Sequence, residues 1–186
     1  MCGLMLVRPC KLYAEQVMSY KEEMSQNGDS FDGCAGLEDV YSFDEWIDFG
    51  GRLRKKYKEI IFISCGKSAN LEKIEIENYK GTIFYTEGIE IFGEGNHIKL
   101  SVETKDTHNY VGASNFIISK AGWGTVAEAI SSNIPMVLLE REGVLEDSHI
   151  IEELKKQNKA ISMKVEELKV LDMEKLKKKI NTLTTN

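Results

Sequence analysis

The sequence lacks several features that would assign it to a common class of protein. Its 4 cysteines, Cys2, Cys10, Cys34 and Cys65, form no C-x-x-C pair, which favours reduced thiols over disulfides or a zinc site. No apolar run approaches the roughly 20 residues of a membrane-spanning helix, and the apolar residues 4–7 are too few for a signal peptide. A net charge of −6 without a basic face argues against nucleic-acid binding. We therefore expect a soluble, cytoplasmic protein.

Two common nucleotide-binding signatures are also absent, since neither a P-loop nor a G-x-G-x-x-G spacing occurs. The 3 histidines, His97, His108 and His149, lack a paired nucleophile and lack metal-ligand spacing. A self-contained hydrolase and a metal site are therefore not indicated. The 186 residues are enough for one domain, or for one domain with an appendage.

The clearest unit in the sequence runs from Phe116 to Arg141. Its pattern predicts a buried strand at 116–118, a glycine loop, a helix with apolar residues at helical spacing and a second buried strand at 136–139. Gly122 and Gly124 let the backbone approach a ligand closely. The helix that follows offers free N–H groups and a positive dipole end, so we expect this loop to bind an anion.

Glu128 lies one helical turn after Thr125, so both side chains can border the glycine loop. A hydroxyl and backbone amides suit a phosphate, and a carboxylate one turn on suits the ribose hydroxyls of a nucleotide. The alternative is a solvated glutamate on an ordinary helix, and the spacing alone leaves both open. Trp123, between the two glycines, either forms a wall of the ligand site or covers an end of the sheet.

From residue 59 onward, predicted strands alternate with predicted helices. The expected strands comprise residues 59–64, 81–86, 97–101, 116–118, 136–139 and 159–163. The expected helices, besides the one after the glycine loop, comprise residues 105–113, 145–157 and 165–183. This alternation predicts an α/β fold, a Rossmann-like parallel sheet with helices on both faces. Ligands bind beyond the carboxyl ends of such strands, where the loops at Gly66 and Gly122 would meet.

The first part of the chain predicts a small, mainly helical segment. We expect a short strand at 4–8, an amphipathic helix at 11–26 and a second helix from Phe43 towards Tyr57. Ser42, with a glutamate three residues later, predicts a capping box at the start of the second helix. Two consecutive glycines in the middle of that helix should weaken or break it.

Residues 1–57 contain LMLVRP, NGDSFDG and SFDEWIDF followed by RLRKKY. In these stretches the segment resembles the opening of a GNAT-type acetyltransferase, over about 55 residues. The Q/R-x-x-G-x-G/A loop with which that family binds acetyl-CoA is absent from the sequence. The resemblance thus implies the substrate-side edge of an acetyltransferase without its cofactor half.

Residues 58–186 carry SKAGWGTVAE, PMVLLE and LEDSHIIEEL. In these stretches they resemble the carboxyl-terminal domain of a GT-B glycosyltransferase of family 28, the group that includes the N-acetylglucosaminyltransferase of peptidoglycan precursor synthesis. The resemblance implies one half of a GT-B fold, which binds a nucleotide-sugar donor, usually a UDP-sugar, as substrate and uses no further cofactor. It also implies an amino-terminal acceptor domain, in place of which this chain has the acetyltransferase-like segment.

The resemblance implies a donor site position by position. It places the pyrophosphate near residues 122–125, the ribose hydroxyls on Glu128 and the hydroxyls of the donor sugar on Glu146 and Asp147. His149 either touches the same sugar or lies on the surface of its helix. The donor-site residues implied or considered are Gly66, Ser68, Gly122, Trp123, Gly124, Thr125, Glu128, Glu146, Asp147 and His149.

No catalytic residue is assigned, because in this group the general base lies in the acceptor domain. The first turn also departs from the family, since it has the single glycine of CGKS where relatives usually have two. We expect a donor-binding glycosyltransferase half that transfers a hexosyl or N-acetylhexosaminyl group once a separate chain supplies the acceptor domain. The alternatives are a nucleotide-binding module without turnover and an N-acetyltransferase acting through the first 55 residues.

Overall fold

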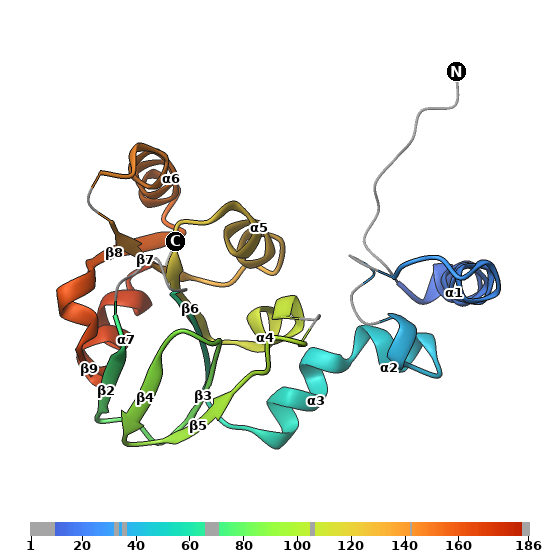
Figure 1. The fold of residues 1–186 in the computed structure, drawn as a ribbon, viewed down its shortest axis with the longest axis horizontal. Helices are drawn as coiled ribbons and strands as arrows, with labels where there is room; N and C mark the ends of the chain where they lie inside the picture. The colour runs from blue at the N-terminus through green and yellow to red at the C-terminus, as the bar shows by residue number, and fades with distance from the viewer. Residues whose placement is uncertain are drawn as a thin grey trace.

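The computed structural model describes residues 10–31, 34, 37–65, 71–104, 107–141 and 143–183 (Figure 1). The predicted strand at 4–8 lies outside these residues, as do Gly66 and Ser68 of the first glycine turn. Among the described helices, none combines the length and the apolar character that crossing a membrane requires.

The amino-terminal part of the described chain is helical. It consists of η1 (Lys11–Tyr13), α1 (Ala14–Asn27), η2 (Leu37–Asp39), α2 (Phe43–Ile47) and α3 (Phe49–Lys56). The Ser42 half of the predicted capping box is present, because the Ser42 hydroxyl accepts a hydrogen bond from the Glu45 N–H at 3.2 Å. The Glu45 carboxylate accepts from the Tyr41 N–H at 2.9 Å instead of from the Ser42 N–H. The helix that follows is broken, as expected. The break lies at Asp48, however, and Gly50 and Gly51 are both inside α3.

Six parallel strands form the central sheet in the order β5–β3–β1–β6–β7–β8. They are β1 (Ile60–Ser64), β3 (Thr82–Tyr85), β5 (Asn96–Lys99), β6 (Phe116–Lys120), β7 (Met136–Glu140) and β8 (Ala160–Lys164). Every strand expected after residue 58 is therefore present. β1, β6 and β7 are apolar and buried on both faces, as is typical of parallel strands covered on both sides.

Helices α4 (Thr107–Ala113), α5 (Trp123–Ser131) and α6 (Leu145–Lys156) cover one face of this sheet (Figure 1). Helix α7 (Met173–Asn181) lies on the other face. The alternation along β1 shows the two layers, because Phe62 packs with α4 and α6 residues while Ile63 packs with α7 residues. The α/β, Rossmann-like fold with helices on both faces is confirmed.

A second, three-stranded parallel sheet was not predicted. It consists of β4 (Glu90–Gly93), β2 (Lys73–Glu77) and β9 (Val170–Asp172), in that order, and it contributes to the same core as α7. The predicted single helix over 165–183 is therefore wrong in its first part, which forms η4 (Val165–Leu168) and β9 before α7 begins. Leu171 pairs with Ile76 in this sheet, and both side chains are buried.

Helix α3 connects the amino-terminal helices to the sheet. The Arg54 guanidinium donates hydrogen bonds to the carbonyls of Ala113 at 3.2 Å and Gly112 at 2.5 Å, at the end of α4. Leu53 and Tyr57 pack against the core on that face of the sheet. The end of the predicted 1–57 segment thus contributes to the core of the sheet unit.

Candidate functional site

The order of the central strands reverses between β1 and β6. From β1 the chain continues to β3 and β5 on one side, and from β6 it continues to β7 and β8 on the other. Ser64 and Ser119 pair near the carboxyl ends of the two strands. In open parallel sheets the crevice outside such a switch point is where ligands bind. The residues at this edge therefore form the candidate site.

Cys65 follows β1 at this edge and is fully buried. Burial raises the pKa of its thiol from 9.0 to about 12, so the thiol stays protonated near neutral pH. Cys65 is a packing residue rather than a nucleophile. The next residues, which include Gly66 and Ser68, lie outside the described chain, so their role at the site stays a prediction.

The amino end of α5 lies directly beyond β6. Gly122 is the N-cap and has no side chain to cap the helix, and its carbonyl accepts the first helical hydrogen bond, from the Val126 N–H at 3.0 Å. The N–H groups of Trp123, Gly124 and Thr125 therefore have no acceptor within the helix. A Cβ added at Gly124 would meet no atom of the described residues within 4 Å, so they leave room beside this turn. The Trp123 side chain is 65% exposed.

Lys120 also lies at the amino end of α5, and the sequence did not identify it as a candidate site residue. It is the last residue of β6, and its Cε lies 3.4 Å from where a Cβ on Gly122 would be. Its ammonium, one bond further along, is thus held beside the amino end of α5. A lysine at the last position of a central strand, directly before a glycine loop, is the signal that could have identified it.

Glu128 is half-buried in the second turn of α5, as is Thr125 one turn earlier. Within the described part of the chain, no hydrogen bond or ion pair to the Glu128 carboxylate is found. Burial raises the pKa of this carboxyl above its ordinary value of 4.5. A half-buried carboxylate without a donor is poorly solvated, and it is therefore well suited to accept hydrogen bonds from a ligand.

The two acidic residues expected to contact a donor sugar both lie in the first turn of α6, beyond β7, but they differ in exposure. Glu146 is exposed, whereas Asp147 is only 3% exposed. Both Asp147 oxygens accept from Arg141, with distances of 2.5 Å from Nε to Oδ2 and 2.7 Å from Nη2 to Oδ1. His149 is exposed, and a cavity of about 240 Å³ lies beside the ion pair.

The structure brings most of the predicted donor-site residues to one edge of the sheet. Strands β6 and β7 are neighbours, so the helices that follow them, α5 and α6, begin side by side at the carboxyl ends (Figure 1). This edge combines helix N–H groups, a lysine and an unpaired carboxylate. Within the described ranges, no group of three or more His, Cys, Asp or Glu side chains is placed to hold a metal ion.

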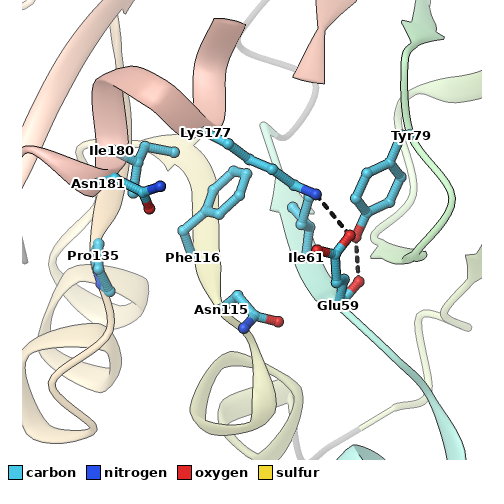
Figure 2. A pocket seen from close by; sticks show the side chains of 9 residues that line it. All are labelled: Glu59, Ile61, Tyr79, Asn115, Phe116, Pro135, Lys177, Ile180 and Asn181. Atoms are coloured by element: carbon cyan, nitrogen blue, oxygen red, sulfur yellow. Dashed lines mark hydrogen bonds and ion pairs between the residues drawn. The ribbon is translucent and has the colours of Figure 1, made fainter. Parts of the chain in front are cut away.

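A cavity of about 340 Å³ lies at the opposite edge, beside the amino ends of β1, β6 and β7 (Figure 2). There the Lys177 ammonium pairs with the Glu59 carboxylate at 2.6 Å and lies 4.8 Å from the centre of the Tyr79 ring. The Tyr79 hydroxyl donates to the Glu59 carbonyl, and the Asn115 side chain accepts from the Ile60 N–H at 2.8 Å. These groups join α7 to the starts of the strands, so we regard this cavity as structural.

Residues 51–186 match the sequence model of the Glycosyltransferase family 28 C-terminal domain. The chain belongs to this family. The predicted resemblance is therefore confirmed, and the sheet unit is a glycosyltransferase-type donor-binding domain. The match begins inside α3, the helix whose Arg54 bonds to α4.

The fold is also similar to parts of two solved structures. The match to the glycosyltransferase SnogD from Streptomyces nogalater has a TM-score of 0.46 and 13% identity and covers 67% of this chain and 34% of that one. The match to the glycotransferase of kitacinnamycin has a TM-score of 0.44 and 10% identity and covers 69% of this chain and 35% of that one. The chain thus spans about a third of the length of each.

No curated protein sequence matches this chain significantly. The family match leaves out residues 1–50. The resemblance of the amino-terminal segment to an acetyltransferase and the boundary after residue 57 therefore stay predictions.

Proposed function

We propose that this domain binds a UDP-sugar at the carboxyl edge of the central sheet and serves as the donor half of a glycosyltransferase. The observation that carries the proposal is Glu128, a half-buried carboxylate without a partner in the described chain, one turn into a helix that has no side-chain cap at its amino end. A protein gains nothing in stability from such a group, but a nucleotide with ribose hydroxyls would supply its hydrogen bonds.

The diphosphate is expected at the amino end of α5. The N–H groups of Trp123, Gly124 and Thr125 point along the helix axis towards it, and the helix dipole favours a negative charge there by about 0.3 to 2 kcal/mol. The Thr125 hydroxyl can donate a further hydrogen bond. The Lys120 ammonium beside Gly122 supplies a positive charge that attracts the diphosphate.

The ribose then lies over the first turn of α5, with its hydroxyls on Glu128. Hydrogen bonds to a charged group contribute about 1.5 to 3 kcal/mol, so this contact accounts for a large share of nucleotide affinity. The exposed Trp123 ring, between two glycines, offers an apolar wall to the donor. We propose that the sugar extends towards the first turn of α6, over the neighbouring strand β7.

We propose that transfer of a hexosyl or N-acetylhexosaminyl group needs a separate chain that supplies the acceptor domain. The family model that matches describes a C-terminal domain, which supports the need for a further domain. For the same reason, a nucleotide-binding module without turnover is the second candidate. The two candidates agree on the donor site and differ in turnover.

Titration calorimetry with UDP, UDP-N-acetylglucosamine, UDP-glucose and acetyl-CoA tests the proposal. We expect UDP and at least one UDP-sugar to bind and acetyl-CoA not to bind. Binding of acetyl-CoA alone would instead support the acetyltransferase interpretation of the first 55 residues. The same mixtures are then assayed by chromatography after a separate acceptor domain is added, and transfer of the sugar under that condition distinguishes a transferase half from a module without turnover.

A further inference from the structure

The amino-terminal helices carry the net negative charge of the chain. Residues 10–48 contain 10 acidic and 2 basic residues, a net charge of −8, so all other residues together carry +2 of the total of −6. The family match begins only at residue 51, and α1 and α2 lie apart from the central sheet (Figure 1). This acidic segment is therefore a unit of its own, which α3 connects to the sheet.

A groove of about 550 Å³ lies between α1 and the residues that precede α2. Met18 of α1, together with Val40 and Tyr41, supplies its apolar walls, and the Tyr41 side chain is 94% exposed. Of the residues of α1, only Met24 is buried. An exposed aromatic ring beside an apolar groove is typical of a surface that a protein partner covers.

The groove is acidic as well as apolar. Glu15 and Glu22 line it, both are exposed, and neither forms an ion pair within the part of the chain that the structure describes. They lie two helical turns apart on α1, which is about 10 Å along its axis. Lys21 is the one basic residue among the described residues that line the groove, and it donates to the carbonyls of Glu38, at 2.9 Å, and Val40. The two carboxylates are therefore available to cations from outside the chain.

We propose that this groove is a docking site for a basic, amphipathic helix of a partner protein. Apolar side chains of that helix cover Met18 and Tyr41, and lysine or arginine side chains two turns apart pair with Glu15 and Glu22. The inference does not depend on the proposed function, because no residue that lines the groove belongs to the candidate donor site.

A second copy of this chain does not offer such a helix among its described elements. Helices α3 and α7 have the most basic residues, but Leu53 of α3 and Leu176 and Ile180 of α7 already pack in the core of their own chain. Nucleic acid and anionic membranes are disfavoured by the charge of the segment, because like charges repel. The occupant that fits is a separate protein.

Fluorescence anisotropy with a labelled peptide of leucine and lysine tests the proposal on the full chain. The peptide has about 18 residues, or five helical turns, with leucines along one face and lysines two turns apart on each side of them. At about 0.15 M salt, which screens distant charges, it should bind at least about tenfold more tightly than a peptide of the same composition without an apolar face. A peptide with glutamate in place of lysine should not bind. Equal binding of the first two peptides would overturn the proposal.

A pair of tyrosine variants locates the apolar contact. Tyr41→Ala should weaken peptide binding about fivefold or more, because exposed aromatic side chains at a groove contribute strongly to binding. Tyr20→Ala is the matched control, since it removes an exposed tyrosine of α1 that does not line the groove, and it should leave peptide binding unchanged. Both variants should keep the thermal midpoint of the parent. Equal peptide affinities for the two variants would contradict docking in the groove.

Two double variants that remove the same charge locate the ion pairs. Glu15→Gln with Glu22→Gln should weaken peptide binding roughly three- to thirtyfold. Glu23→Gln with Asp29→Asn changes two exposed acidic residues that do not line the groove, so binding should change by less than about twofold. Equal losses in both double variants would show attraction to the whole acidic segment and would overturn the proposal.

Analytical ultracentrifugation of the chain alone tests the other occupant. The parent and Tyr41→Ala should both sediment as monomers. A dimer of the parent that Tyr41→Ala dissociates would make a second copy the occupant of the groove and would overturn the proposal. UDP affinity, measured by calorimetry, should be the same in Tyr41→Ala as in the parent, so failure of the docking proposal leaves the proposed function standing.

Discussion

At the scale of single residues, Glu128 affects stability through its charge. Burial raises the pKa of this carboxyl in the folded protein above the ordinary 4.5. Its contribution to stability is therefore fully present below the unfolded pKa and is lost as the pH rises through the folded pKa. We expect Glu128→Gln to raise the thermal midpoint of the ligand-free protein slightly at pH 7 and to leave it unchanged at pH 3.5. Equal midpoints for parent and variant at pH 7 would contradict this expectation.

The same residue should have the opposite effect on binding. Loss of hydrogen bonds to a charged group, at about 1.5 to 3 kcal/mol, means that Glu128→Ala should weaken UDP binding by roughly ten- to a hundredfold. Glu128→Gln should lose less, because its amide oxygen still accepts. Calorimetry on both variants measures the loss.

The controls for the Glu128 prediction are one further protein variant and two nucleotides that each lack a ribose hydroxyl. Glu153→Ala removes an exposed glutamate of α6 and should leave UDP affinity unchanged. The parent should bind 2′-deoxy and 3′-deoxy nucleotides more weakly than UDP, and Glu128→Ala should bind all three about equally. If the deoxy nucleotides lose as much affinity with Glu128→Ala as with the parent, Glu128 does not contact the ribose.

At the scale of elements, Tyr79 connects the turn after β2 to the start of β1. Its hydroxyl donates to the Glu59 carbonyl, which also accepts from the Thr82 N–H at 3.0 Å. A Cβ at Gly81 would overlap both the Tyr79 hydroxyl and the Glu59 carbonyl, so the chain fits closely here. Because the carbonyl keeps one donor, Tyr79→Phe should reduce the free energy of unfolding by only about 1 kcal/mol.

Chemical denaturation of Tyr79→Phe measures this change. UDP affinity should stay the same, because Tyr79 lies at the edge of the sheet opposite the candidate site (Figure 2). Burial and the Glu59 charge also raise the pKa of Tyr79 in the folded protein. The parent should consequently lose stability as the pH rises above about 10, and part of that loss should be missing in the variant. A large effect of Tyr79→Phe on nucleotide affinity would contradict a purely structural role for the cavity that Tyr79 lines.

At the scale of the whole molecule, α3 belongs with the sheet, while α1 and α2 lie apart from it (Figure 1). α1 buries only Met24, whereas the end of α3 adds Leu53 and Tyr57 to the core, with the Tyr57 ring centre 5.3 Å from that of Phe84. An aromatic pair contributes about 0.5 to 1.5 kcal/mol, and each hydrogen bond of Arg54 about as much.

Removal of α3 should therefore destabilise the sheet unit. A protein of residues 49–186 is expected to unfold at nearly the same denaturant concentration as the whole chain. A protein of residues 58–186 should be less stable by about 2 to 4 kcal/mol, from the loss of one aromatic pair and two hydrogen bonds. Equal stability of the two shortened proteins would show that α3 contributes little.

The amino-acid sequence by itself determined the elements that local pattern encodes. The β-branched run 60–64, the helix after Gly122 and the Ser42 N-cap were predicted correctly, because each depends on neighbouring residues or on simple periodicity. The glycine loop is shorter than predicted, because α5 begins at Trp123 and includes Gly124. Their order was enough to predict a parallel sheet and the edge at which a ligand would bind. The stretch SKAGWGTVAE, which is contiguous, indicated the family.

Tertiary structure alone decided the features that depend on residues far apart in the chain. Lys73–Glu77 becomes a strand because it pairs with Val170–Asp172, and that pairing also interrupts the helix predicted over 165–183. A strand of 3 to 5 residues has little stability without a partner, so no local signal could identify it. The exposure of individual side chains likewise depends on contacts between distant elements. Asp147 and Glu146 are adjacent in sequence, but only the packing of α6 against β7 turns Asp147 towards Arg141 and leaves Glu146 exposed.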